Sequence, residues 1–228
     1  MRSCFKPSNA VLCLAGNVDE TRAINQINKH FADIISEDNI IRFSRVSKPR
    51  HYKRYLIESE NSNRISVCAA VQTPPRGHED TAVFHILKYI VIEKFANGMR
   101  GTFPCTVNAD FIEKRALSLF IVHIEIINKD DRRRALICQR SLLSGFGLNV
   151  SKGELDKAKC NFRLDYYKQM APLSRRALRL SERCLNGDSP LTISEEVDKP
   201  CAVSNQDIKR IVNTYFRHNN TRITELQL

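Results

Sequence analysis

Histidine and acidic side chains are the residues of this 228-residue chain that could hold a metal ion. His123 and Glu125 lie two residues apart in an alternating apolar run, so a strand there places both on one face. Two ligands fall short of the three or four protein ligands that zinc takes, and a polar, solvent-facing strand surface explains the pair equally well. His78, Glu79 and Asp80 stand at a predicted helix start, where their side chains point in different directions.

His85 stands alone in a mostly apolar segment, which favours a partly buried, hydrogen-bonded histidine over a ligand. The sequence has no G-x-S-x-G turn, no phosphate-binding loop and no Rossmann glycine pattern. It also lacks any C-x-x-C pair. We therefore predict no catalytic, cofactor-binding or metal-binding residue in this chain.

Cysteine is frequent, but the spacing suits neither a zinc knuckle nor the disulfide framework of a small secreted domain. Most cysteines fall in apolar strand-like or helical runs, so we interpret them as small buried hydrophobic residues. This usage favours a reducing compartment such as the cytoplasm, although a periplasmic location fits if the chain is a fragment of an exported protein. The eight are Cys4, Cys13, Cys68, Cys105, Cys138, Cys160, Cys184 and Cys201.

A net charge of +11 raises the question of a polyanionic partner. Basic residues cluster at 48–54, 132–134 and 175–176, which we interpret as a basic linker and solvated helix surfaces. No nucleic-acid recognition motif accompanies them, so nucleic acid is disfavoured as a partner. The longest apolar run, 82–92, is interrupted by His85 and Lys88 and is too short to span a bilayer.

The first elements that we expect are a strand over 10–18 and a helix that Asp19 caps and that ends near Ile35. The apolar stripe of this helix consists of Ile24, Ile27, Phe31 and Ile34. The following stretch, 36–53, is polar and basic, contains Pro49 and shows no sustained period, which is typical of a linker.

Beyond the linker, the pattern predicts strands over 55–58 and 64–73, the second stopped by Pro74 and Pro75. Asp80 is expected to cap a long helix, apolar on most faces and therefore buried, that runs to about Ala96. Alternating runs over 106–114 and 117–127 predict an antiparallel hairpin.

The C-terminal part reads as helices followed by a strand. Ser151 with Glu154 forms a capping box before a stripe of Leu155, Ala158, Phe162 and Tyr166. A further helix after Pro172 carries Leu173, Ala177, Leu180 and Cys184, a last helix opens at Ser204 and Asp207, and a strand covers 222–228. The predicted fold class is α+β, with helices packed on an antiparallel sheet.

In order and spacing, these segments resemble the insulinase, pitrilysin and mitochondrial processing peptidase family of zinc metallopeptidases. The resemblance rests on Asn9 and Gly16 around the first predicted strand, on Thr73 to Arg76 before the long helix, and on Tyr215 with Asn219 and Asn220 near the end. It implies that 1–35 is the strand and helix that end a preceding family domain, that 36–53 is a linker, and that 54–228 is a processing-peptidase-like α+β domain. The chain is then a fragment or a shortened, divergent homologue.

Catalysis in this family requires an H-x-x-E-H motif, and none of the six histidines begins or ends one. An Arg and a Tyr that hold substrate in the family's C-terminal half correspond to the stretch Phe95 to Cys105, which has Arg100 but no tyrosine. The resemblance thus implies a non-catalytic domain, which binds no cofactor itself and leaves zinc to a catalytic partner half.

We therefore expect a non-catalytic part or homologue of a zinc metalloendopeptidase that pairs with a catalytic half to enclose peptide substrate. A homodimer is an alternative assembly. Two other readings remain: a basic interaction module that binds nucleic acid or another polyanion, and a stand-alone degenerate homologue with a scaffold role.

Overall fold

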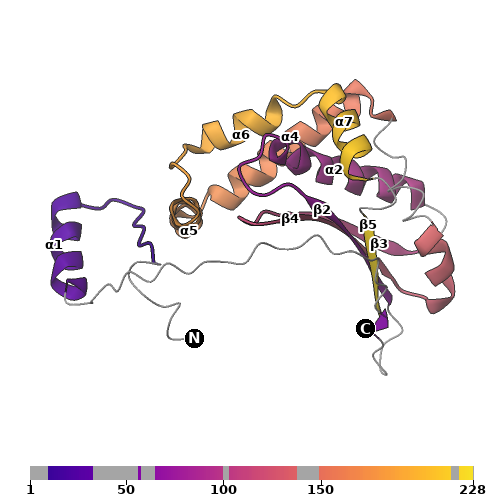
Figure 1. The fold of residues 1–228 in the computed structure, drawn as a ribbon, viewed down its shortest axis with the longest axis horizontal. Coiled ribbons are helices and arrows are strands. Elements are labelled where there is room, and N and C mark those ends of the chain that lie inside the picture. The colour runs from indigo at the N-terminus through magenta and orange to yellow at the C-terminus, as the bar shows by residue number, and fades with distance from the viewer. Residues whose placement is uncertain are drawn as a thin grey trace. The chain divides into compact units, whose positions relative to one another are not determined.

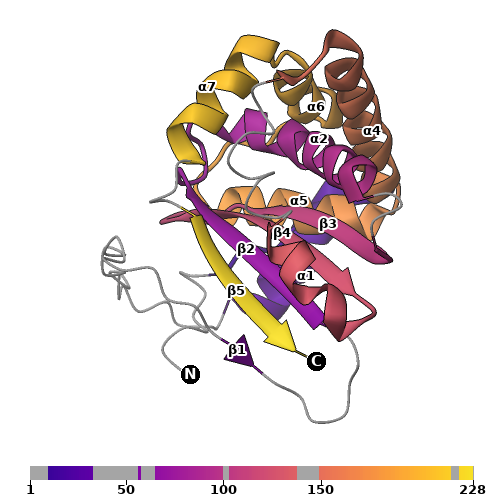
Figure 2. The ribbon, with the colours of Figure 1, turned by 90° about the vertical axis from the view of Figure 1, so that its right-hand side faces the viewer.

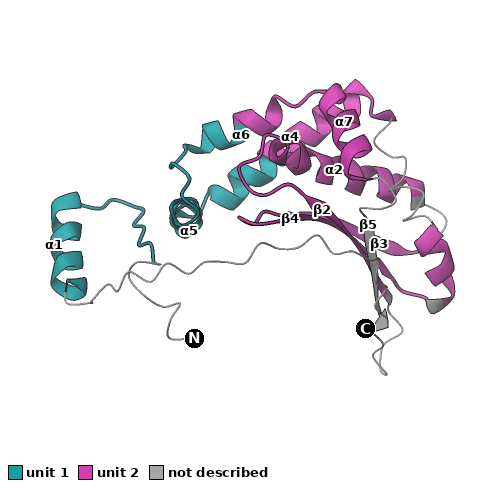
Figure 3. Cartoon of the chain, viewed as in Figure 1, with its two compact units in different colours: residues 1–45, 164–197 teal, residues 46–163, 198–228 magenta. Residues whose placement is uncertain are grey.

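The structure, a computed structural model, describes residues 10–32, 56–57, 65–99, 103–137, 149–216 and 221–227. The predicted linker at 36–53 and the expected helix end at Ile35 lie outside the described residues. The chain divides into two compact units (Figure 3): residues 1–45 with 164–197, and residues 46–163 with 198–228. The sequence did not predict that 164–197 groups with the N-terminal segment.

The first unit begins with an irregular segment and a helix. Helix α1 (Glu20–Phe31) starts where predicted, because the Asp19 carboxylate accepts a 2.8 Å hydrogen bond from the Arg22 N–H. The strand predicted over 10–18 is wrong: residues 10–19 form no strand. An apolar run becomes a strand only when a neighbouring strand takes its backbone hydrogen bonds, and the described residues of this unit offer none.

Helix α5 (Leu173–Leu185), which begins after Pro172 as expected, also belongs to this unit. Gly187, at φ +79°, follows the helix end in the left-handed conformation that favours glycine. Neither α1 nor α5 has a fully buried residue: Ile24, Phe31 and Leu173 are exposed, while Ile27 and Leu180 are half-buried. Cys184 is exposed, so the prediction that it is a small buried hydrophobic residue is wrong.

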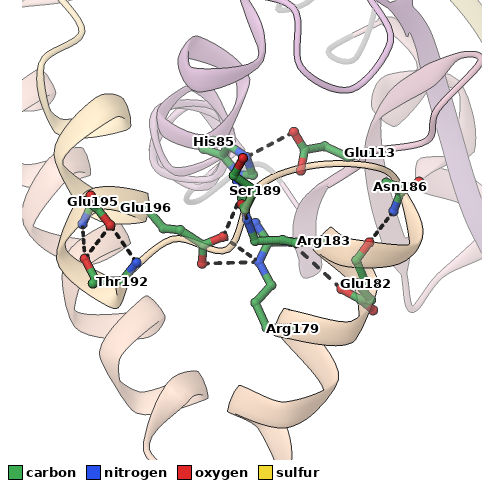
Figure 4. Close-up of polar contacts among 10 residues, drawn as sticks. All are labelled: His85, Glu113, Arg179, Glu182, Arg183, Asn186, Ser189, Thr192, Glu195 and Glu196. Carbon is green, nitrogen blue, oxygen red and sulfur yellow. Dashed lines mark hydrogen bonds and ion pairs between the residues drawn. The ribbon is translucent and has the colours of Figure 1, made fainter. Parts of the chain in front are cut away.

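Two arginines of α5 share one carboxylate (Figure 4). Arg179 Nε and Arg183 Nη1 each lie 3.0 Å from Oε1 of Glu196, which is almost fully buried. Glu196 belongs to α6 (Ile193–Cys201), a helix that the sequence analysis did not predict and that contains Pro200 near its end. Thr192 and Glu195 start α6 with reciprocal caps, as Thr192 N–H donates to Glu195 Oε2 over 2.7 Å.

The second unit is built on a five-stranded sheet with the order β1-β5-β2-β4-β3 (Figure 2). Strands β2 to β5 pair antiparallel, and the short β1 pairs parallel with β5, so the predicted antiparallel sheet and its hairpin are confirmed. The strands are β1 (Leu56–Ile57), β2 (Ile65–Thr73), β3 (Cys105–Ile112), β4 (Ser118–Ile126) and β5 (Thr221–Gln227).

Helices cover one face of this sheet (Figure 1): α2 (Thr81–Met99), α7 (Asn205–Tyr215) and the first part of α4 (Lys152–Met170). Helix α2 is buried on most faces as predicted, with Phe84, Ile86 and Leu87 fully inaccessible to solvent. Phe84 stacks on Phe111 with ring centres 5.2 Å apart, which joins α2 to β3. Burial of these large side chains supplies the main stabilising free energy of the unit.

Helix α4 packs on α2 through both apolar and charged contacts. Of its predicted stripe, Leu155, Ala158 and Phe162 are buried and Tyr166 is half-buried. The capping box is present, with Ser151 N–H donating to Glu154 Oε2 over 2.7 Å.

No helix in the described part of the chain is long and apolar enough to cross a membrane.

Candidate functional site

His123, the first metal-ligand candidate, lies on β4 on the face of the sheet that the helices leave open. Its Nε2 is hydrogen-bonded to the hydroxyl of Ser66 on β2. Cys68 lies directly opposite His123 in the register, and Glu125 lies opposite Ser66. This side-chain hydrogen bond links β2 to β4 across the open face of the sheet.

His85, the second candidate, lies on α2 among aromatic rings. Its ring meets Phe111 edge-on with centres 5.1 Å apart and lies 5.9 Å from Phe162. Its Nε2 is 3.7 Å from Oε1 of Glu113 (Figure 4). The partial burial expected from the sequence is present, but the contact with Glu113 is longer than the hydrogen bond that was expected. Through its aromatic neighbours the ring joins α2 to β3 and to α4.

The third candidate group, His78 to Asp80, contains the most polar buried site of the second unit. The Asp80 side chain, 3% exposed, uses its two oxygens differently: Oδ2 accepts a 2.9 Å hydrogen bond from Tyr215 Oη, and Oδ1 lies 2.6 Å from Nη2 of Arg210. At this distance Oδ1 and the Arg210 guanidinium form a close ion pair. His78 Nδ1 accepts from the Asp80 backbone N–H over 3.1 Å.

The Asp80 carboxylate departs from the predicted role, because it contacts α7 and does not cap α2 with its side chain. Burial, followed by the hydrogen bond to Asp80, raises the pKa of Tyr215 to about 12. The same carboxylate raises the pKa of Arg210. Both shifts mean that a neutral phenol and a charged guanidinium are held against a buried anion.

The Asp80 network therefore fastens the start of α2 to α7. The residues of this network are far apart in the sequence, since 135 positions separate Asp80 from Tyr215. The sequence signal was an aspartate between a Pro-Pro turn and an apolar helix, with a tyrosine in the last turn of an amphipathic helix. No spacing rule links these two features.

The open face of the sheet is the one extended surface that the described strands present opposite the helices. On β4 its residues are Leu119, Ile121, His123 and Glu125, all half-buried, while the other face holds the fully buried Phe120 and Ile124. By register, the same surface continues onto the exposed Thr106, Asn108 and Asp110 of β3 and onto Cys68, Ala70 and Gln72 of β2. The face is mixed in polarity, with apolar, neutral polar and acidic side chains.

No metal site emerges from these placements. Across the described ranges, no group of three or more His, Cys, Asp or Glu side chains could hold a metal ion. Arg100, the candidate for substrate holding, lies outside the described residues. The histidines 78, 85 and 123 lie on a turn, a helix and a strand, and the structure does not assemble them into one site.

The fold and the histidine placement define a class: a peptidase-like α+β domain without a described zinc site. A family model described as the peptidase M16 inactive domain matches residues 1–120, more than half of the sequence. The chain therefore belongs to this family, which confirms the resemblance to insulinase- and processing-peptidase-type proteins. No curated protein sequence matches the chain.

Solved structures with the same fold include a protease from Helicobacter pylori, 15% identical with a TM-score of 0.78, which covers 94% of this chain and 54% of that one. A chain of complex III2 from Candida albicans, in a structure with Inz-5 bound, is 14% identical with a TM-score of 0.76, at coverages of 93% and 53%. A candidate zinc protease from Bordetella pertussis Tohama I is 17% identical with a TM-score of 0.63, at coverages of 73% and 95%. The chain thus spans about half the length of the first two.

Proposed function

We propose that this chain is the non-catalytic half of an M16-type peptidase, and that it pairs with a zinc-bearing half to enclose peptide substrate. The observation that carries the proposal is the open face of the sheet, which lies opposite the layer formed by α2, α7 and the first part of α4 in the same unit. A broad, rigid and half-buried surface of mixed polarity suits contact with extended peptides of varied sequence.

The face, and not the edge, of the sheet is the part that we assign to peptide contact. Strand β3 is an edge strand, but its Phe111 N–H donates a 2.8 Å hydrogen bond to the neighbouring Asp110 carboxylate. That N–H is therefore not available to an added strand, and an acidic side chain at an edge also discourages strand addition. Peptide binding by extension of the sheet at this position is disfavoured.

A partner half is supported by length and by exposed apolar surface. The chain covers only 54% and 53% of two structures that share its fold, so those chains contain a further region of similar size. In the first unit, α1, α5 and the N-terminal stretch each expose apolar side chains, more than a monomer usually leaves in water. They are Val11, Leu12, Leu14, Val18, Ile24, Phe31, Leu173, Leu178 and Leu185.

The polyanion-binding alternative gains no specific support from the described residues. Several basic side chains are engaged in ion pairs within the fold, including Arg179 and Arg183 with Glu196, and Lys157 with Glu93 over 2.7 Å. Paired cations displace fewer counterions from a phosphate backbone than free ones do.

The first experiment tests assembly. The chain is mixed with a zinc-bearing M16 half encoded in the same genome, and complex formation is measured by size-exclusion chromatography with light scattering. Fluorogenic peptide cleavage by each component and by the mixture is measured in parallel. We expect a stable heteromeric complex and cleavage that requires both components. Separate elution of the two with unchanged activity of the zinc-bearing half would overturn the proposal, as would a homodimer that excludes that half.

Two substitutions separate pairing from peptide contact. Leu178→Asp, at an exposed position of α5, is expected to weaken complex formation while the chain stays folded. Ile121→Arg, on the open face, is expected to leave the complex intact and raise KM for peptide. Ile137→Arg, at an exposed isoleucine outside the strands, is the matched control and should change neither quantity. Equal effects of Ile121→Arg and Ile137→Arg would contradict the assignment of the open face.

A further inference from the structure

The open face of the sheet is apolar at the end next to the turn between β3 and β4. Leu119 and Ile121 of β4 are half-buried there. Ile112 of β3, which is exposed, lies beside Leu119 in the register. Ala70 of β2 lies beside Ile121. Side chains at directly opposite positions of antiparallel strands have Cβ atoms about 4.5–5.5 Å apart, so these four side chains form one apolar patch.

The same face is polar toward the other end of β4. His123, hydrogen-bonded to Ser66, is followed on this face by the half-buried Glu125. On β3, the exposed Asn108 and Thr106 lie opposite these two residues of β4. Two residues of rise separate neighbouring side chains on one face of a strand, so the polar region begins directly after the apolar patch.

The charged groups of this face are carboxylates, although the whole chain has a net charge of +11. Among the described side chains of β2, β3 and β4, the face presents Asp110 and Glu125 and no Lys or Arg. The Asp110 carboxylate accepts the Phe111 N–H, whereas Glu125 takes part in no ion pair among the described residues. A half-buried carboxylate with no cation beside it favours a positively charged ligand.

We propose that the open face selects extended peptides in which an apolar side chain and a basic side chain stand four residues apart. The apolar side chain packs on the patch around Ile121, and the basic side chain pairs with Glu125. This inference rests on the proposed function, because it takes the open face to be the surface that contacts peptide.

The spacing follows from the geometry of extended chains. Ile121 and Glu125 are four positions apart on one face of β4, which corresponds to about 14 Å at the rise of an antiparallel strand. An extended peptide that lies parallel to β4 spans this distance over four residues. Since its side chains also alternate, the first and the fifth residue of such a stretch point to the same side.

The test uses short peptides of serine, threonine and glycine that carry one leucine and one lysine. In one isomer these two residues stand four positions apart, and in the other they stand three apart, so that their side chains point to opposite sides of an extended chain. Dissociation constants for the full chain are measured by fluorescence anisotropy of labelled peptides, and kcat/KM is measured for the complex with the zinc-bearing half. We expect the first isomer to be favoured about fivefold, the effect of one solvent-accessible ion pair.

Three substitutions assign the preference to individual side chains. Glu125→Gln should abolish the advantage of lysine over glutamine in the peptide and keep the advantage of leucine over serine. Ile121→Thr, which keeps a β-branched residue in the strand, should do the reverse. Asp156→Asn removes one negative charge from an exposed position of α4 and is the matched control for net charge, so it should change neither preference. Circular dichroism checks that each variant stays folded.

The outcomes separate this inference from the proposed function. Equal binding and cleavage of the two isomers overturns the inference and leaves the pairing of the two halves standing. An effect of Asp156→Asn as large as that of Glu125→Gln also overturns it, because the preference then follows net charge alone. Absence of a cleaving complex, while the full chain still prefers the isomer with four-residue spacing, overturns the proposed pairing and supports the inference.

Discussion

The Asp80 network gives a prediction that can be worked out from individual contacts. Tyr215→Phe removes one hydroxyl that donates to a carboxylate only 3% exposed to solvent, and it keeps the ring that packs on Phe84 at 5.5 Å. A hydrogen bond to a charged group contributes about 1.5–3 kcal/mol, so the variant should lose about that much stability. Tyr167→Phe, at an exposed tyrosine of α4, is the matched control and should change stability by less than about 0.5 kcal/mol.

The assay is urea unfolding followed by far-UV circular dichroism, because the chain has no tryptophan to report by fluorescence. Amide hydrogen exchange of α7 adds a local measurement at the helix that Tyr215 ends. In an Asp80→Asn background the acceptor is neutral, so Tyr215→Phe should cost only about 1 kcal/mol. A cost of Tyr215→Phe that matches the Tyr167→Phe control, or that is the same in both backgrounds, would refute the proposed role of the charged acceptor.

Three further predictions concern the core, pH and metal content. Leu87→Ala, at a side chain with 0% exposure, should cost about 2–5 kcal/mol in unfolding free energy, whereas Leu178→Ala on α5 should cost far less. Lys94, whose Nζ lies 2.9 Å from Oε1 of Glu154, lowers the pKa of that carboxyl from its ordinary value of 4.5 to about 2. The stability that ionised Glu154 contributes is present above pH 4.5 and is lost as the pH falls toward 2. Glu154→Gln should therefore cost about 1 kcal/mol at neutral pH and progressively less in acid. Plasma mass spectrometry of the dialysed chain should find no stoichiometric zinc; stoichiometric zinc that His123→Ala abolishes would contradict the reading of His123 as a cross-strand link.

The parts of the fold that the sequence predicted are those specified by neighbouring residues. Ser204 with Asp207 forms the capping box of α7, and Ser151 with Glu154 forms that of α4, since each needs only residues three positions apart. The buried helix α2 was predictable because its side chains are apolar on most faces. Contacts between residues far apart in the sequence were not predictable. The partners of the Asp80 carboxylate lie on α7, and no local sequence pattern identifies them.

The errors have a common physical origin, which is the dependence of burial on distant partners. Residues 10–18 have the composition of a strand but form none, because no strand lies beside them among the described residues. The prediction that the cysteines are buried failed for the same reason: Cys160 and Cys184 lie in helices and are exposed. An amphipathic pattern predicts which face of a helix is apolar, and it does not predict whether anything covers that face.

The position of β5 has a consequence for the order in which the second unit folds. Strand β5 lies between β1 and β2 in the sheet, and its Thr224 pairs with Cys68 of β2. During synthesis, β2, β3 and β4 leave the ribosome long before β5 does, so they can pair while the other side of β2 still exposes its backbone groups. An open strand edge of this kind promotes intermolecular association until β5 arrives. Closure of the sheet across roughly 150 residues carries a large loop-closure cost, so we expect it to be the slow step of folding and the stage at which a chaperone would help most.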